Sequence, residues 1–318
     1  MRISGIKAFR YGGLAKVKTT LVFIILVLMQ GCKQPKAVDR VAALYSDMQV
    51  ISNIVYTNVD SVPLALDAYV PMNRLGEPPW VEYTDQRKPT LLFLHGGGWT
   101  SGDKISRSLY LMPYVDKDWC VVTANYRHLD QGNLVEIIRD ARSALNWIYD
   151  NADKYKFDTT KIVVSGESAG GHLALMTGLS TDETVFNHPD ISSRHDLRVA
   201  AIVNWFGVVD LKKTASSWDS AYLHAIAPNE VHRDSILRIA SPITYLKKES
   251  PPIMTIHGDQ DKSAPYEQGV LLHEKLEEIG TTNHFLTIPG KKHGNFSSEE
   301  MTMIFSEIWS FLKEQGIN

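Results

Sequence analysis

Five residues around Ser168 have the spacing of a nucleophile turn. The chain reads Gly-Glu-Ser-Ala-Gly over residues 166–170, after the β-branched run 162–164 and before an Ala/Leu-rich helical pattern. A serine in G-x-S-x-G between a strand and a helix sits on a sharp turn with its hydroxyl exposed. Gly166 and Gly170 stand where the strand and the helix crowd together and a side chain would clash. The stretch therefore predicts that Ser168 is a nucleophile.

A run of three glycines indicates where negative charge would be held. The sequence HGGGW at residues 95–99 directly follows the apolar run 90–94. Consecutive glycines cost conformational entropy on folding and contribute no side-chain packing. A site where a ligand must approach the backbone closely explains them better than a flexible turn does. Backbone N–H groups that meet a tetrahedral oxyanion form such a site. An HGGG-type loop ahead of G-x-S-x-G is a specific pairing.

Two histidines compete for the role of the base that a serine nucleophile needs. His293 stands in a loop with glycines and lysines between the last predicted strand and the last predicted helix, which favours an exposed imidazole. His257 ends a strand and is the alternative. The chain order nucleophile, acid, histidine that accompanies G-x-S-x-G favours His293.

Three aspartates compete for the acid that would orient this base. Asp261 lies deep in the loop after the strand predicted over 252–256, where its side chain can turn toward a histidine of the next loop. Asp259 belongs to the same loop and has loop capping as its other interpretation. Asp210 follows the strand that ends at Trp205. We expect Asp261, with Asp259 and Asp210 as alternatives.

Apolar runs alternate with helical patterns through most of the chain. Strands are predicted at 54–70, 90–94, 119–124, 162–165, 199–205, 252–257 and 284–288, and helices at 135–149, 171–179, 267–279 and 297–313. Strands that alternate with helices predict a parallel sheet covered on both faces. Two insertions, residues 180–197 and 212–240, are the expected cap elements.

The first 31 residues differ from the rest. Five Lys and Arg residues without an acid precede nine apolar residues at 21–29, whereas a bilayer-spanning helix takes about 20. A basic segment before a short apolar one is the form of a secretory signal. Gly31-Cys32 after it resembles a bacterial lipoprotein signal, cut before a lipidated Cys32. The alternatives are an uncleaved anchor and a buried cysteine. We expect residues 1–31 to be the signal, 32–50 a tether and 51–318 one domain of an exported, membrane-anchored protein, periplasmic or on the cell surface.

Charge and cysteine content exclude several functions. Removal of residues 1–31 moves the formal net charge from −3 to about −8. An acidic protein without a basic block is a poor candidate for nucleic-acid binding. With Cys32 lipidated, Cys120 remains as a single cysteine in an apolar run, expected to be a buried small hydrophobe. Neither an internal disulfide nor a zinc site of cysteine pairs is then possible.

Taken together, these motifs resemble the α/β-hydrolase superfamily, most closely its hormone-sensitive-lipase-like esterases and the neighbouring bacterial carbohydrate-ester hydrolases. The resemblance covers about residues 50–315 and rests on HGGGW at 95–99, GESAGG at 166–171, HGDQD at 257–261 and KHG at 292–294. It implies a mostly parallel, twisted sheet of about eight strands with helices on both faces and small cap insertions.

The resemblance also assigns roles to residues. It implies that Ser168 is the nucleophile, His293 the general base and acid, and Asp261 the orienting acid. The oxyanion N–H groups would come from Gly97, Gly98 and Ala169. Neither a metal nor an organic cofactor is implied, and the sequence carries no signal for the oligomeric state.

The expected activity is that of a serine carboxylic-ester hydrolase that works through an acyl-enzyme. The HGDQD acid loop, and the lack of a large apolar N-terminal cap helix, favour short-chain acyl or aryl esters over long-chain lipids. Export favours esters on carbohydrates. The alternatives are an amidase or peptidase of the arylformamidase or prolyl-oligopeptidase type, and a non-catalytic binding lipoprotein. Candidates to line the acyl pocket, with core or cap packing as the other interpretation, are Trp99, Trp205, Trp218 and Tyr222.

Overall fold

The computed structural model describes residues 48–59, 61–71, 74–75, 82–83, 86–188 and 195–318. The predicted signal segment 1–31, Cys32 and residues 33–47 of the predicted tether lie outside the described residues. Strand β1 begins at Met48, within the stretch expected to be a tether. Among the helices of the described ranges, none combines the length and the apolar character needed to cross a membrane.

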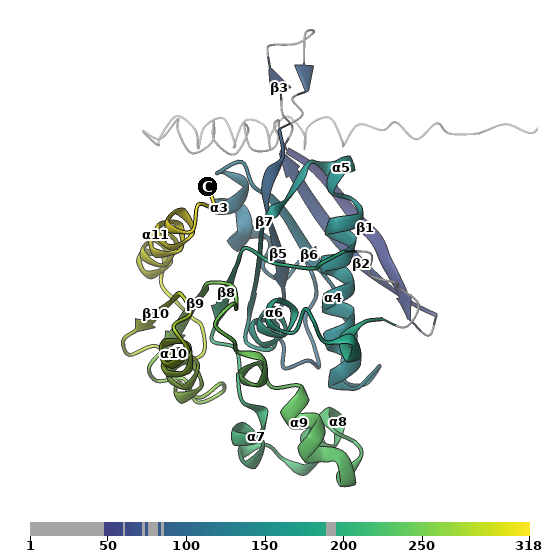
Figure 1. Cartoon of the computed structure of the whole chain (residues 1–318), viewed down its shortest axis with the longest axis vertical. Coiled ribbons are helices and arrows are strands. Elements are labelled where there is room, and N and C mark those ends of the chain that lie inside the picture. Colours follow the sequence, from purple (N-terminus) through teal and green to yellow (C-terminus); the bar gives the residue numbers. More distant parts are fainter. Residues whose placement is uncertain (1–47, 60, 72–73, 76–81, 84–85, 189–194) are drawn as a thin grey trace, which may run out of the picture. The chain divides into compact units, whose positions relative to one another are not determined.

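An eight-stranded sheet carries the site (Figure 1). In spatial order its strands are β1 (Met48–Val59), β2 (Val62–Pro71), β6 (Cys120–Ala124), β5 (Lys88–Leu94), β7 (Phe157–Glu167), β8 (Ala201–Trp205), β9 (Ile253–Gly258) and β10 (Asn283–Ile288). β2 runs antiparallel to both β1 and β6, while β6, β5, β7, β8, β9 and β10 are parallel to one another. A separate small pair joins β3 (Arg74–Leu75) to β4 (Glu82–Tyr83). The predicted sheet of about eight mostly parallel strands is confirmed.

The stretch expected to be one strand, residues 54–70, belongs instead to a hairpin. β1 and β2 pair antiparallel, with Val59 opposite Val62, and Ser61 in the turn has a positive φ of 69°. Both arms of a hairpin alternate inward and outward side chains with a period of two. The apolar alternation therefore continues across the turn and gives no sign of the reversal.

Four long helices lie where the sequence places them, and several short ones were not predicted. Within the described ranges the helices are α3 (Met112–Val115), α4 (Leu134–Asp150), α5 (Ala152–Tyr155), α6 (Ala169–Leu179), α7 (Leu211–Thr214), α8 (Ser220–Ile226), α9 (Arg233–Ile239), α10 (Glu267–Ile279) and α11 (Ser298–Glu314). Short 3₁₀ turns occupy Ser108–Leu111, Thr184–Phe186, Ala215–Ser217, Glu230–His232 and Pro242–Tyr245. α4 and α11 each begin with a capping box, at Asn133 and at Ser297, which satisfies N–H groups that a helix start leaves free.

Different helices cover the two faces of the sheet. Leu92 and Leu94 of β5 pack into the main core with α4 and α6. Because successive strand residues point to opposite faces, Phe93 points to the other face. There the ring of Tyr114 in α3 packs against Trp309 of α11 at 4.8 Å between centroids. Cys120 is buried in the core and has a free thiol, as expected.

The two predicted insertions lie in different places. The described residues of 180–197 pack beside α4, where the Arg142 guanidinium donates hydrogen bonds to the carbonyls of Ser180, Thr181 and Glu183. Residues 212–240 include α8 and α9, which lie with α7 below the sheet in Figure 1. Within the described ranges, only this second insertion borders the cavity that contains Ser168.

Candidate active site

Ser168 occupies a strained turn between β7 and α6. Its φ of 54° and ψ of −118° lie outside the regions that residues with a Cβ prefer, at a cost of roughly 1–3 kcal/mol. Its N–H donates to the carbonyl of Trp205 at 2.8 Å, which ties the turn to the end of β8. A Cβ on Gly170 would lie 2.0 Å from the carbonyl oxygen of Leu94. The turn can therefore form only with glycine at this position.

The structure brings the three predicted triad residues together from three loops. Nε2 of His293 lies 2.8 Å from Oγ of Ser168. Nδ1 of the same ring lies 2.6 Å from Oδ2 of Asp261. A hydroxyl, an imidazole and a carboxylate in this order can pass a proton from the serine to the base while the acid orients the ring.

The alternative acids have structural partners elsewhere. Asp259 accepts a hydrogen bond from the N–H of Gly290 at 2.7 Å, so it ties two loops together. Asp210 caps α7 by accepting from the N–H of Lys213 at 3.0 Å. Within the described part of the chain, neither of these two carboxylates forms a contact with His293.

Asp261 is buried and well supplied with donors. Its Oδ1 accepts the N–H groups of Ser263 at 2.8 Å and of Ala264 at 3.1 Å. Burial alone would raise the pKa of Asp261, but hydrogen bonds from His257, His293 and the Ser263 N–H outweigh it and hold that pKa below its usual range. The acid is therefore ionised at neutral pH, as an orienting partner of an imidazole must be.

His257, the alternative base, lies beside the acid instead of the nucleophile. Its ring is fully buried, and its Nε2 lies 3.3 Å from Oδ2 of Asp261 and 2.9 Å from the carbonyl of Ala264. Sequence reasoning missed this supporting position. The available signal was the i, i+4 spacing of His257 and Asp261 across a tight loop.

The HGGG loop has an unusual backbone. Gly97 and Gly98 have φ values of 123° and 59°, and Trp99 follows at 57°. The carbonyl of Gly96 accepts from Nδ1 of His95 at 2.8 Å. The carbonyl of Gly97 accepts from the N–H groups of Thr100 at 3.0 Å and Ser101 at 3.1 Å. Because a peptide unit is planar, fixing each carbonyl also fixes the direction of the next N–H.

Three N–H groups remain available beside Ser168. Those of Gly97, Gly98 and Ala169 donate to no carbonyl within the described part of the chain. Ala169 is the first residue of α6, where N–H groups have no intrahelical acceptor. All three residues line the same cavity as Ser168. Backbone donors without an acceptor beside a serine are the kind of group that can stabilise an oxyanion.

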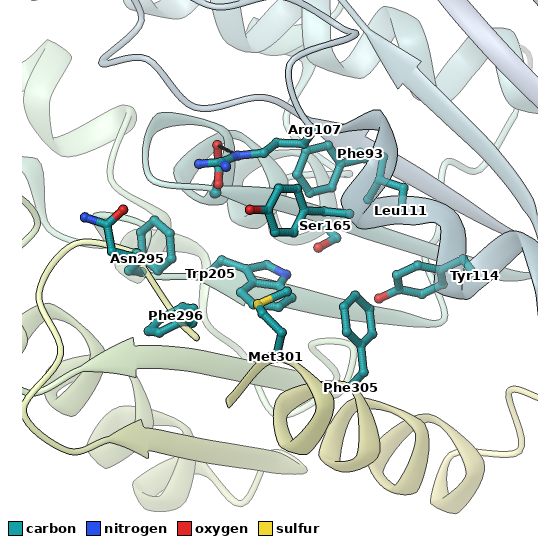
Figure 2. Close-up of a pocket in the computed structure, with 14 residues that line it drawn as sticks. Phe93, Arg107, Leu111, Tyr114, Ser165, Trp205, Asn295, Phe296, Met301 and Phe305 are labelled. Atoms are coloured by element: carbon teal, nitrogen blue, oxygen red, sulfur yellow. Dashed lines mark hydrogen bonds and ion pairs between the residues drawn. The ribbon is translucent and has the colours of Figure 1, made fainter. Parts of the chain in front are cut away.

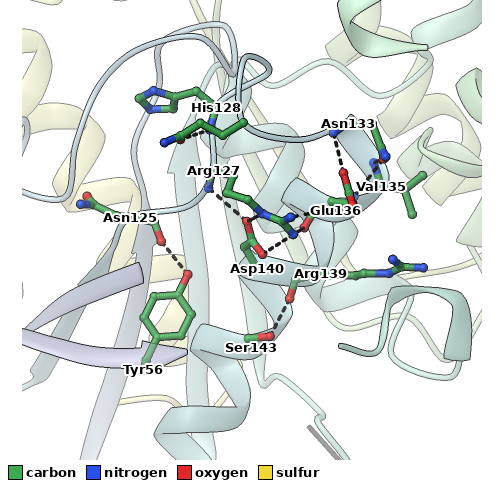
Figure 3. A network of polar contacts seen from close by, with 11 residues as sticks. Tyr56, Asn125, Arg127, His128, Asn133, Val135, Glu136, Arg139, Asp140 and Ser143 are labelled. Carbon is green, nitrogen blue, oxygen red and sulfur yellow. Dashed lines mark hydrogen bonds and ion pairs between the residues drawn. The ribbon is translucent and has the colours of Figure 1, made fainter. Parts of the chain in front are cut away.

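A polar network surrounds the segment that follows β6 (Figure 3). The guanidinium of Arg127 donates to both oxygens of the buried Asp140, at 2.8 and 2.9 Å. Tyr56 donates its hydroxyl to the carbonyl of Asn125 at 2.6 Å. Between these anchors, Tyr126 donates its hydroxyl to the carbonyl of His95 at 2.6 Å and stacks on the His95 ring at 4.2 Å. The segment after β6 thus supports the start of the HGGG loop.

The cavity that Ser168 and His293 line, which we call the catalytic cavity, has a volume of about 430 Å³. Small-molecule sites have volumes of roughly 300–1,000 Å³. Its walls come from the HGGG loop, the Ser168 turn, the His293 loop and the second insertion. Trp99, Trp218 and Tyr222 line it, as the sequence allowed. Trp99 is also packed in the core, with only 2% of its surface exposed.

A second cavity, which we call the aromatic slot, adjoins the first (Figure 2). It holds about 90 Å³ and lies on the face of the sheet covered by α3 and α11. Trp205, a predicted pocket residue, belongs to the slot and not to the catalytic cavity. Its apolar walls are Phe93, Leu111, Tyr114, Trp205, Phe206, Phe296, Met301 and Phe305. Residues shared by both cavities are Arg107, Glu167, Phe206, Gly294 and Asn295.

An ion pair stands where the two cavities meet, and sequence reasoning missed it. Nε of Arg107 donates to Oε1 of Glu167 at 2.7 Å (Figure 2). Glu167 directly precedes Ser168, and Arg107 lies over the ring of Tyr110 at 5.1 Å. The only signal in the sequence was the charge of Glu167 inside the nucleophile motif.

Known proteins resemble this chain in sequence and in fold. The BD-FAE family model matches residues 80–276, which is more than half of the chain. The chain belongs to the BD-FAE family. The match includes Ser168, Asp261 and the HGGG loop, and it ends before His293. The BD-FAE assignment and the eight-stranded sheet together establish an α/β-hydrolase.

A known relative of this BD-FAE chain is an esterase. Esterase LipC of Mycobacterium tuberculosis is 28% identical over 213 residues, which cover 65% of this chain and 53% of LipC. The chain spans about half the length of this esterase and of two other M. tuberculosis ester hydrolases that it matches.

Solved structures share the fold over most of both chains. Esterase Est2 of Thermogutta terrifontis, in a propionate-bound form, superposes with a TM-score of 0.70 at 25% identity, over 85% of this chain and 95% of Est2. A truncated carbohydrate esterase from gut microbiota has a TM-score of 0.69 at 22% identity, over 85% of this chain and 97% of that chain. The second likeness concerns the fold alone.

Proposed function

We propose that the protein is a serine carboxylic-ester hydrolase. The observation that carries this proposal is the unbroken contact series Ser168 Oγ, His293 Nε2, His293 Nδ1 and Asp261 Oδ2, at 2.8 and 2.6 Å. Free N–H groups of the HGGG loop and of α6 lie in the same cavity. The esterase relatives agree with this activity.

The reaction follows from the positions of these groups. His293 takes the proton of the Ser168 hydroxyl as the oxygen attacks the ester carbonyl. The N–H groups of Gly97, Gly98 and Ala169 stabilise the oxyanion, and each such donor contributes roughly a few kcal/mol to the transition state. His293 then protonates the leaving alcohol. Water activated by His293 releases the acid from the acyl-enzyme, and Asp261 keeps the imidazole oriented in both halves.

The proposed substrates are esters of short-chain acyl or aryl acids, including esters on carbohydrates. The aromatic slot beside Ser168 supports an apolar or planar acyl group, since apolar walls favour the burial of such surface. The catalytic cavity leaves room for an alcohol larger than a small leaving group. Est2, a structural neighbour, was solved with propionate, and another neighbour is described as a carbohydrate esterase.

A substrate panel tests this proposal. Purified protein is assayed with p-nitrophenyl acetate, butyrate and octanoate, and with acetylated and feruloylated oligosaccharides. We expect kcat/KM to be highest for acetate or butyrate, and acid release from at least one oligosaccharide. Intact oligosaccharides alongside rapid cleavage of p-nitrophenyl esters would remove the carbohydrate part of the proposal. Absence of turnover on every ester, with cleavage of aryl formamides or peptides, would contradict the ester specificity.

We also propose that the protein is exported and anchored by lipid on Cys32. The support is the basic and apolar segment before Gly31-Cys32. Acyl chains contribute about 0.8 kcal/mol per buried CH₂, so several chains anchor a protein firmly. Expression with an alkyne fatty acid should label the wild-type chain in the membrane fraction and leave Cys32→Ala unlabelled, with Cys120→Ala as the matched control. Equal labelling of the wild type and Cys32→Ala would contradict lipidation at this residue.

A further inference from the structure

Tyr222 connects the second insertion to the HGGG loop. It lies in α8, whose start is capped by Asp219 accepting from the Tyr222 N–H at 2.8 Å. Its hydroxyl donates to the carbonyl of Gly98 at 3.0 Å. These residues are 124 positions apart in the chain, so the bond joins two segments that are distant in the sequence, at the wall of the catalytic cavity.

Aromatic packing strengthens this connection. The Tyr222 ring is roughly parallel to that of Trp99, with centroids 6.4 Å apart. Trp218 meets Tyr222 edge to face at 5.4 Å and Trp99 at 6.3 Å. Rings in such arrangements attract one another in addition to burying apolar area. The insertion is therefore packed against the residue that follows Gly98.

The hydrogen bond from Tyr222 restrains Gly98, a part of the HGGG loop whose backbone is intrinsically flexible. Glycine has no Cβ to restrict φ and ψ, and Gly98 adopts a φ of 59°. The peptide unit before Gly98 is fixed because Thr100 and Ser101 donate to the Gly97 carbonyl. The peptide unit after Gly98 is fixed by Tyr222. The Gly98 N–H belongs to the first of these units. The Tyr222 bond holds the second unit, and so restrains rotation about the Gly98 backbone between the two.

We propose that Tyr222 is a positioning residue for the oxyanion hole, so that the second insertion contributes to catalysis in addition to covering the cavity. The inference rests on the proposed ester hydrolysis. Burial raises the pKa of the Tyr222 hydroxyl, so it stays a donor across the neutral pH range. Removing the hydroxyl leaves the Gly98 carbonyl without this donor and allows the loop to sample other conformations.

The test is Tyr222→Phe in the full chain, which keeps the ring packing and removes only the hydroxyl. Loss of a direct oxyanion donor costs roughly 10²–10³ in kcat, so an indirect effect is expected at about tenfold in kcat, with KM for p-nitrophenyl acetate changed less than twofold. Phenylboronic acid, which forms a tetrahedral adduct on a serine nucleophile, should bind more weakly by a similar factor, because such an adduct resembles the transition state.

Tyr245→Phe is the matched control. The Tyr245 hydroxyl donates to the carbonyl of Ile239 at 2.6 Å, so this variant loses the same kind of bond away from the HGGG loop. It should keep the wild-type kcat and phenylboronic acid affinity.

Three outcomes would contradict the inference. The first is a Tyr222→Phe protein with wild-type kcat and boronate affinity. The second is a rise in KM alone, which would make Tyr222 a substrate contact. The third is an equal loss in Tyr245→Phe. A wild-type protein without ester turnover would instead contradict the proposed function, and boronate binding by the two variants would still test the role of Tyr222.

Discussion

The imidazole of His257 lies beneath the candidate triad, with its Nε2 atom 3.3 Å from Oδ2 of Asp261. The same carboxylate oxygen contacts Nδ1 of His293 at 2.6 Å, so Asp261 is held between two histidines. Nε2 of His257 also donates to the carbonyl of Ala264. Both contacts of this nitrogen are to residues of the acid loop, so His257 positions the acid.

Replacing His257 should therefore lower activity without abolishing it. In His257→Leu the carboxylate of Asp261 loses one donor and the Ala264 carbonyl is left unpaired in a buried place. At metal sites, loss of a group that orients a ligand costs roughly 10–100-fold, and we expect a fall in kcat of that order here. His257→Gln, which supplies an N–H donor, should recover part of it. Steady-state kinetics on p-nitrophenyl acetate measure both; equal kcat in wild type and His257→Leu would contradict a positioning role.

Two neighbouring glycines should respond differently to alanine. A Cβ at Gly97 would lie 2.0 Å from the carbonyl oxygen of Ser101, so Gly97→Ala must displace the loop and should lower kcat by about 10²-fold or more. At Gly98 the nearest atom would be the Tyr222 hydroxyl at 3.5 Å. Gly98→Ala meets only the cost of a left-handed backbone and should lose about tenfold or less.

The kinetics of the two glycine variants, with melting temperatures to show that both are folded, check this order. A larger loss in Gly98→Ala than in Gly97→Ala would mean that the backbone of the HGGG loop differs from the one described.

Filling the aromatic slot should change the acyl preference. Met301 lines the slot from α11, and Met301→Trp would occupy its volume of about 90 Å³. We expect kcat/KM for p-nitrophenyl octanoate and for a hydroxycinnamate ester to fall at least about tenfold, since overpacked sites reject added groups, while acetate changes less than threefold. Met303→Trp on the exposed side of the same helix is the control. An equal loss on acetate would show that the slot is not an acyl site.

Three buried histidines should make stability depend on pH. Burial lowers the pKa of His95, His172 and His273 to about 4, against about 6.5 in an unfolded chain. Between these values the unfolded state binds more protons than the native state. The contribution of these three histidines to the free energy of unfolding is therefore complete above about pH 6.5, and it decreases as the pH falls toward 4.

Urea midpoints at pH 7, 5.5 and 4.5 measure this dependence. His273→Gln removes one of the three groups at a place where the ring contacts Asn283 at 2.7 Å, away from Ser168. Its midpoint should fall less steeply on acidification than that of the wild type. The same slope in both proteins would rule out a contribution from His273.

Much of the fold could be predicted because its central strands are buried on both faces. The run at residues 90–94 is apolar throughout, and the helix over 135–149 repeats its apolar residues with helical period, so each type was readable locally. The hairpin of β1 and β2 could not be predicted, because apolar and polar residues alternate with the same period before and after its turn. The position of residues 180–183 depends on Arg142 contacting carbonyls 38 to 41 positions away, which no local pattern contains.

The candidate triad could be predicted for a related reason. Ser168, Asp261 and His293 each stand in a loop that directly follows a strand, and parallel strands bring such loops to one edge of the sheet. Arg107 lies just before a 3₁₀ turn and Tyr222 lies in the short helix α8, and neither segment is long enough to show a periodicity in the sequence. Their partners, Glu167 and Gly98, lie 60 and 124 positions away. The sequence offered Tyr222 as a pocket residue, but its bond to Gly98 and the whole role of Arg107 follow only from the folded chain.

The most direct test of the account is the rate of p-nitrophenyl acetate hydrolysis by the wild-type chain and by Ser168→Ala, measured side by side. Removing the nucleophile leaves only the residual catalysis of binding and the oxyanion hole, so the rate should fall by at least about 10³-fold, with the melting temperature unchanged within a few degrees. A Ser168→Ala protein that retains more than a tenth of the wild-type rate would contradict the assignment of Ser168 as the nucleophile.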